Sequence, residues 1–282
     1  MERNKKIQIY CLFAASAFLG LFGAVCLYLG IFSEYDDAMG HFAVSSVFAP
    51  CAYLCFFAGP LLGFVGWIVF RGHSSLDESP WASVITRVGC AVAAVCVLAS
   101  FILDINAASD ALKPVSNTAL PFYNVSRLFA MLSVVSFAVN ALISKKAPAK
   151  PIASLLSFAP VIYCALKVML MYFDQSIAVN SPVKLTCQLA FISYLLVFTA
   201  HTGLSLGRGQ IFPRYLFTLC AAMAIGGSAS IACLFVNLLG VTCAAISKTD
   251  YICLMGFLVY TCCSFGVAAD TRLEYKKKVK SK

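Results

Sequence analysis

Long apolar segments constrain the fold of this chain more than any other feature of its sequence. Each is long enough to cross a hydrocarbon core of about 30 Å. Because lipid offers no hydrogen-bond partners to a bare backbone, each segment is predicted to be helical. The sequence therefore predicts an all-α, polytopic transmembrane helix bundle of about eight spans, at residues 7–32, 42–70, 83–104, 121–143, 152–173, 184–206, 213–238 and 250–269.

The composition argues against a water-soluble fold. Only 12% of the residues are charged and 61% are hydrophobic, whereas a soluble domain has about 25% charged residues. The connections between the segments are too short to form a separate soluble domain. We therefore expect one transmembrane domain over residues 1–271, followed by a basic cytoplasmic tail over residues 272–282.

The basic residues lie mainly on one side of the predicted spans. If the N-terminus is cytoplasmic, 15 of the 21 lysines and arginines are on that side, and only Lys113, Lys184 and Lys248 are on the other. This asymmetry predicts a multi-pass protein of the plasma membrane with both termini in the cytoplasm. The net charge of +9 is then an orientation signal rather than a sign of nucleic-acid binding. The tail is expected to attract anionic lipid headgroups.

No pattern in the sequence predicts a metal, a cofactor or a catalytic group. The 14 cysteines lie in or beside apolar segments and form neither a disulfide framework nor a zinc-ligand array. Residues 203–207 match the Gly-x-Ser-x-Gly nucleophile pattern, with His201 four residues before Ser205. That pattern works at a sharp strand-to-helix turn, which the end of a membrane helix does not provide.

Carboxylates are missing from the middle of every predicted span. Asp104, Asp174, Asp250 and Asp270 all fall at predicted helix ends. Transport coupled to a proton through a central acid is therefore not expected.

Small residues at helical spacing predict close contacts between helices. Gly59 and Gly63 are four residues apart in the second span, a spacing that lets two backbones approach. The run Gly226 to Ser230 in the seventh span is the place where a helix break is most expected.

Two cations inside the membrane are the best candidates for a binding site. Arg127 is six residues past the outer start of the fourth span, and Lys167 is six residues before the outer end of the fifth. Both are thus predicted about 9 Å below the outer boundary. An anion could bind between them; alternatively, Lys167 snorkels to the interface and pairs with Asp174. The polar groups predicted at the same level are Tyr123, Asn124, Tyr163 and Gln188.

These residues favour transport or binding of a small anionic or amphiphilic solute. The alternative is a non-catalytic accessory or sensory membrane subunit, which would have a partner subunit and no solute. The third possibility is a membrane-embedded enzyme, for which the Gly203 to Gly207 match is the only local support. In each case the lipid bilayer is the expected surrounding of the protein.

Overall fold

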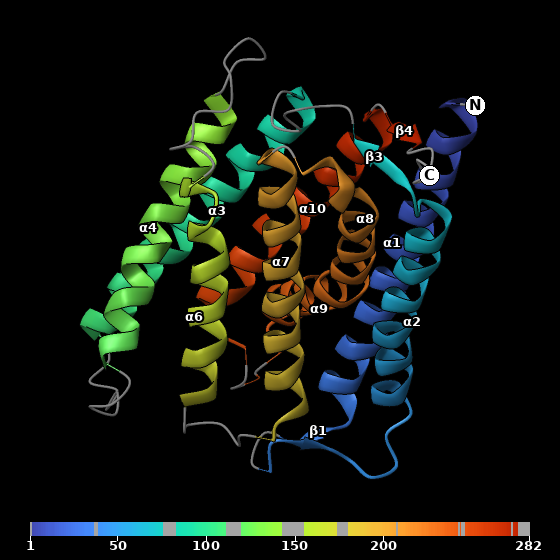
Figure 1. The fold of residues 1–282 in the computed structure, drawn as a ribbon. Helices are drawn as coiled ribbons and strands as arrows, with labels where there is room; N and C mark the ends of the chain where they lie inside the picture. The colour runs from blue at the N-terminus through green and yellow to red at the C-terminus, as the bar shows by residue number, and fades with distance from the viewer. Residues whose placement is uncertain are drawn as a thin grey trace.

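The computed structural model of the chain describes residues 2–36, 39–75, 83–110, 120–142, 155–173, 180–206, 208–241, 243, 246–271 and 273–275. Its helices pack side by side as one bundle (Figure 1). The helices are α1 (Glu2–Ser33), α2 (Phe48–Val69), α3 (Val84–Asp110), α4 (Leu120–Leu142), α6 (Ala159–Phe173), α7 (Pro182–Ser205), η2 (Gly209–Ile211), α8 (Phe212–Ala221), the π-helical segment η3 (Ala222–Gly226), α9 (Gly227–Leu238) and α10 (Lys248–Asp270).

Two small antiparallel sheets lie at the ends of the bundle. β1 (Tyr35–Asp36) pairs with β2 (His41–Phe42), and β3 (His73–Ser75) pairs with β4 (Leu273–Tyr275). The second sheet joins the chain after α10 to the connection that follows α2. Lys6 Nζ lies 2.9 Å from Asp270 Oδ1, so the start of α1 and the end of α10 meet at one end of the bundle.

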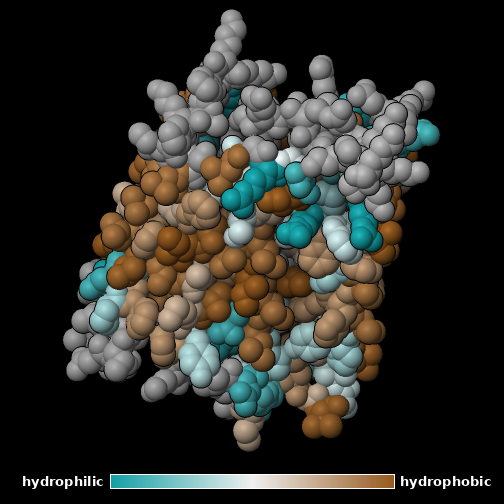
Figure 2. All heavy atoms as spheres, in the orientation of Figure 1, coloured by the Kyte–Doolittle hydropathy of each residue, from teal (hydrophilic) through white to brown (hydrophobic). Residues whose placement is uncertain are grey.

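The predicted all-α, membrane-spanning bundle is confirmed. Among the described residues, seven helical stretches are long and apolar enough to cross a membrane. Three of these stretches end at Ser205, Leu238 and Asp270. In their apolar parts, 67% to 78% of the residues are buried inside the bundle, against 33% to 39% in the other four stretches. The second group turns more of its apolar side chains outward, and hydrophobic residues form a broad band across the face of the bundle shown in Figure 2. A surface of this kind suits contact with lipid acyl chains.

The boundaries of the second and fifth predicted spans are wrong. The second span begins at Phe48 rather than residue 42, because His41 and Phe42 pair with β1. The fifth span, predicted over 152–173, is represented by α6, a helix of 15 residues. At 1.5 Å per residue α6 is about 22 Å long, which is shorter than a hydrocarbon core. Residues 152–154, and residues 276–282 of the predicted tail, lie outside the described residues.

Glycines in α2 pack against the helix that contains α8 and η3, as the small-residue spacing predicted. A Cβ atom on Gly59 would collide with the side chain of Ala224. A Cβ atom on Gly63 would lie 2.7 Å from the carbonyl oxygen of Phe217 and 3.1 Å from its Cα. The backbones of α2 and α8 thus approach too closely at this point to accommodate a larger residue.

Gly63→Ala is therefore expected to destabilise the protein by about 1 to 3 kcal/mol, because the added methyl group meets backbone rather than a movable side chain. The matched control is Gly266→Ala in α10, where the nearest atom is 3.4 Å away on the Ile85 side chain. That change should be neutral or slightly stabilising, since alanine favours a helix more than glycine does. Melting temperatures in detergent test the pair, and equal effects at both positions would contradict the close approach.

The run Gly226 to Ser230 does not break the helix. The irregularity is the π-helical segment Ala222–Gly226, which ends at the first residue of this run and joins α8 to α9 as one continuous helix. Ser228 Oγ donates to the carbonyl oxygen of Gly20 at 3.0 Å, and Ser230 Oγ to that of Leu254 at 3.2 Å. The small residues after the π-helical segment therefore attach this pass to α1 and α10.

Candidate functional site: a charge cluster between four helices

Four charged side chains meet at the end of the bundle opposite to the Lys6–Asp270 pair. Asp104 lies on α3, Arg127 on α4, Lys167 on α6 and Asp250 on α10. α3 packs against both α4 and α10, and α6 packs against α4, so the four helices are neighbours. We call Asp104, Arg127, Lys167 and Asp250 the charge cluster.

Lys167 is the most buried member of the charge cluster, with 7% of its surface exposed. Its Nζ lies 2.9 Å from Asp250 Oδ1 and 3.4 Å from Asp104 Oδ2. Asp250 is in the first turn of α10, where the helix dipole favours a negative charge. Lys167 thus bridges α3, α6 and α10, and its charge is compensated by two carboxylates.

This arrangement corrects the prediction that acids are confined to helix ends. The third span was predicted to end at Asp104, but α3 continues to Asp110 and places Asp104 six residues inside the helix. Asp104 therefore lies about 9 Å from the helix end, at the level of Arg127. The predicted partner of Lys167, Asp174, lies outside the described residues.

Arg127 makes weaker contacts than Lys167. One terminal nitrogen of its guanidinium donates to the carbonyl oxygen of Asp104 at 3.3 Å and to the Tyr123 hydroxyl at 3.2 Å. The guanidinium carbon lies 4.3 Å from the centre of the Tyr123 ring, a cation–π contact. Its Nε is buried and has no hydrogen-bond partner in the described part of the chain. Within the described ranges, Arg127 forms no ion pair.

Two of the four polar residues predicted around the cations are next to the charge cluster. Tyr123 bonds Arg127 as described, and its hydroxyl also donates to the Asp104 carbonyl at 3.5 Å. Tyr163 is 2% exposed and its ring centre lies 5.9 Å from Lys167 Nζ. Asn124 points to the exposed side of α4, while Gln188 is buried on α7. Neither makes a hydrogen bond to a member of the charge cluster within the described residues.

Sequence reasoning missed the roles of Asp104 and Asp250. A signal for Asp104 was present, since no glycine or proline follows it until Pro114, so the helix could continue past it. Asp250 carried no such signal. Its contact with Lys167 requires α10 and α6 to come together in the fold. In the sequence, 74 residues and two other membrane-spanning stretches separate these helices.

The nucleophile-like pattern at residues 203–207 has no catalytic geometry in the residues described. Ser205 Oγ donates to the Thr202 carbonyl at 2.7 Å instead of meeting His201. His201 Nδ1 lies 2.7 Å from the Tyr260 hydroxyl and 3.3 Å from the Tyr215 hydroxyl. The His201 side chain is fully buried, so it lies in the protein core rather than at the membrane interface.

A metal site is not evident in this part of the chain. No group of three or more His, Cys, Asp or Glu side chains that could hold an ion occurs among the described residues. No disulfide joins the described cysteines. The charge cluster, with two cations and two carboxylates, is the main ionic feature of the described membrane-spanning region.

Comparison with known proteins adds no relative to this description. No protein-family model matches the chain, and no curated protein or solved structure is significantly similar to it.

Proposed function

We propose that this membrane protein binds or transports a small anionic or amphiphilic solute, with the Arg127 guanidinium as its first contact. One observation carries the proposal. Within the described residues, Lys167 is compensated by two carboxylates, whereas Arg127 has only a carbonyl oxygen and a hydroxyl as hydrogen-bond partners. The formal charges of the cluster cancel, but they are unevenly distributed.

An unpaired guanidinium is well suited to an anion. It carries five N–H donors in a planar fork, which matches the two oxygens of a carboxylate or phosphate. One terminal nitrogen is used for the contacts with Asp104 and Tyr123, and the buried Nε has no partner among the residues that the structure describes. Away from bulk water, the attraction between the guanidinium and an anion is stronger than at an exposed surface.

Lys167 is the second contact in this proposal. Its bond to Asp250 is short, while its contact with Asp104 is longer, at 3.4 Å. An anion beside Arg127 would compete with Asp104 for the ammonium group. Tyr123 supplies a ring and a hydroxyl contact to Arg127, and the Tyr163 ring lies beside Lys167. Asn124 and Gln188 stay in the proposal as more distant polar groups, without support from a contact.

The proposal is tested by a thermal-shift screen of the detergent-purified protein against small carboxylates, phosphates and sulfonates. A solute at 100 times its Kd stabilises the folded state by about 2.7 kcal/mol through mass action. Each hit is repeated with the matched methyl ester or neutral amide. We expect an anion to raise the melting temperature and its neutral analogue to leave it unchanged, and equal shifts from both would contradict the proposal.

A second candidate, the accessory or sensory subunit, is favoured by the compensated charge of Lys167. An ion pair shared by three helices can serve to hold the bundle in one arrangement. This candidate predicts that no anion stabilises the protein and that a second chain co-purifies with it in stoichiometric amount. The enzyme alternative gains no support from the described residues, in which Ser205 Oγ bonds the Thr202 carbonyl and His201 Nδ1 lies beside two tyrosine hydroxyls.

We further infer that the chain crosses the plasma membrane eight times, with both termini in the cytoplasm. The basic residues of the sequence support this orientation. A reporter fused after Lys282 is expected to be active only if it works in the cytoplasm, and one inserted near Asp110 only if it works outside. An exported reporter that is active at the C-terminus would contradict the orientation.

A further inference from the structure

An open apolar groove runs between α1 and α2 on the outer surface of the bundle. Its volume is about 430 Å³. Phe18 and Leu61, at its sides, are 67% and 66% exposed. Ala15 and Ala58 give the groove its depth, because their methyl groups leave space between longer neighbours. The remaining lining residues are Leu19, Leu62 and Val65, so every group that faces the groove is apolar.

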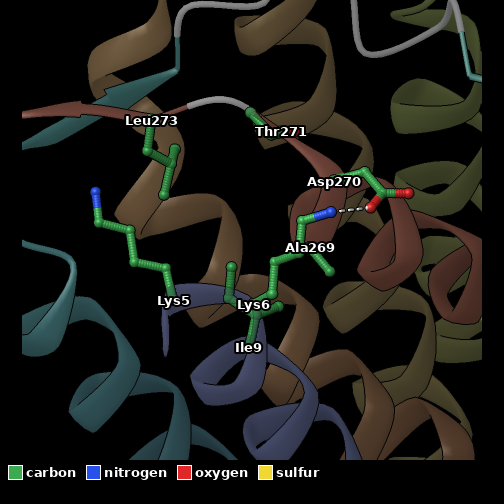
Figure 3. Close-up of a pocket in the computed structure, with 7 residues that line it drawn as sticks. All are labelled: Lys5, Lys6, Ile9, Ala269, Asp270, Thr271 and Leu273. Carbon is green, nitrogen blue, oxygen red and sulfur yellow. Dashed lines mark hydrogen bonds and ion pairs between the residues drawn. The ribbon is translucent and has the colours of Figure 1, made fainter. Parts of the chain in front are cut away.

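Two cations without an ion-pair partner among the described residues lie at one end of the same two helices. Lys6 turns toward Asp270, while Lys5 points the opposite way (Figure 3). Arg71 follows the end of α2, and its guanidinium lies 5.8 Å from the centre of the Trp67 ring. His73 adds no charge at neutral pH, because partial burial and the nearby Lys5 lower its pKa.

The groove and the two cations have the spacing of a lipid molecule. Ala15 and Leu19 are 10 and 14 residues after Lys5, or about 15 and 21 Å along α1. Val65 and Ala58 are 6 and 13 residues before Arg71, or about 9 and 20 Å along α2. Trp67 is four residues before Arg71 and its ring contacts the Arg71 guanidinium, and tryptophan is enriched at the level of lipid headgroups. The groove therefore covers the depth of the acyl chains in one leaflet.

We propose that this face binds one anionic phospholipid, with its phosphate at Lys5 and Arg71 and an acyl chain in the groove between Ala15 and Ala58. Charge complementarity favours this occupant over a second copy of the chain. A symmetric dimer formed through the same face would bring two sets of Lys5 and Arg71 to one level, where like charges repel. The site is separate from the charge cluster, which lies at the other end of the bundle.

Native mass spectrometry of the detergent-purified protein tests the site. The protein is incubated with equal amounts of dioleoylphosphatidylglycerol and dioleoylphosphatidylcholine, which share their acyl chains and differ in charge. We expect one molecule of phosphatidylglycerol to be retained in preference to phosphatidylcholine. Lys5→Gln and Arg71→Gln should each reduce the preference about fivefold, as the loss of one cation near a lipid phosphate predicts.

Lys6→Gln is the matched control. It removes the same charge from the neighbouring position, but Lys6 is already paired with Asp270. The preference for phosphatidylglycerol should then change less than about twofold. An equal loss in Lys5→Gln and Lys6→Gln would show a general charge effect and overturn the site.

The acyl-chain part is tested by Ala58→Leu, which fills the groove. Ala15→Leu does the same from the exposed side of α1, so one variant remains informative if the other does not fold. Either is expected to reduce lipid retention while circular dichroism stays unchanged. Soluble glycerol phosphate should compete only weakly, because it has no acyl chain. Full lipid retention in both filled variants, displacement by glycerol phosphate, or equal retention of the two lipids would each overturn the proposal.

Discussion

Lys167→Gln is expected to destabilise the unliganded protein by about 3 kcal/mol. The side chains of Asp104 and Asp250 are only 21% and 16% exposed, and both would lose their cation. Removing one partner of a buried ion pair costs about 3 to 5 kcal/mol, because the remaining charge stays buried without compensation. The lower value applies here because both carboxylates keep some contact with solvent. The melting temperature in detergent measures the effect.

A second substitution separates charge from packing in this test. In Lys167→Gln/Asp250→Asn, one of the stranded carboxylates is also removed, so a large part of the lost stability should return. Lys167→Arg keeps the charge and should be milder than Lys167→Gln. A melting temperature like that of the wild type in Lys167→Gln would mean that the lysine reaches the interface, as the snorkelling interpretation predicts.

Whether Lys167→Gln stabilises or destabilises the unliganded protein could not be predicted from the sequence. Considered alone, Lys167 is an uncompensated cation in an apolar segment, and its removal would be expected to stabilise the empty protein. The structure supplies carboxylates from α3 and α10, so the expected effect is reversed. The length and apolarity of a segment indicate a membrane helix, but they do not tell which helices become neighbours.

Local spacing was informative where both partners lie on one helix. Tyr123 and Arg127 are four residues apart and therefore share a face, and their cation–π contact follows from that spacing. Helix ends were harder to predict, as Asp104 illustrates, since a polar residue can either end a span or lie inside it. The partners of His201 come from α8 and α10, so its burial could not be inferred from α7 alone.

Arg127→Gln is expected to abolish the stabilisation by any anion found in the screen, with little change in the unliganded protein. Hydrogen bonds to a charged group contribute about 1.5 to 3 kcal/mol, so losing one or two of them weakens the affinity about 10-fold to 100-fold or more. The unliganded protein should change by less than about 1 kcal/mol, because the two hydrogen bonds lost within the described residues are long and the cost of burying an unpaired cation is removed with them. The measurement is the melting temperature as a function of anion concentration.

Conservative variants show which property of Arg127 acts on the anion. Arg127→Lys keeps the charge but loses the planar fork, so an anion that binds through two oxygens should lose most of its affinity in this variant. Tyr123→Phe keeps the ring beneath the guanidinium and removes only the hydroxyl, which should leave a partial response. Asn124→Ala, next to Tyr123 but on the exposed side of α4, removes a more distant polar group and should weaken the response less than Tyr123→Phe does. If the anion stabilises Arg127→Gln as strongly as the wild type, the solute binds elsewhere and Arg127 has a packing role on α4.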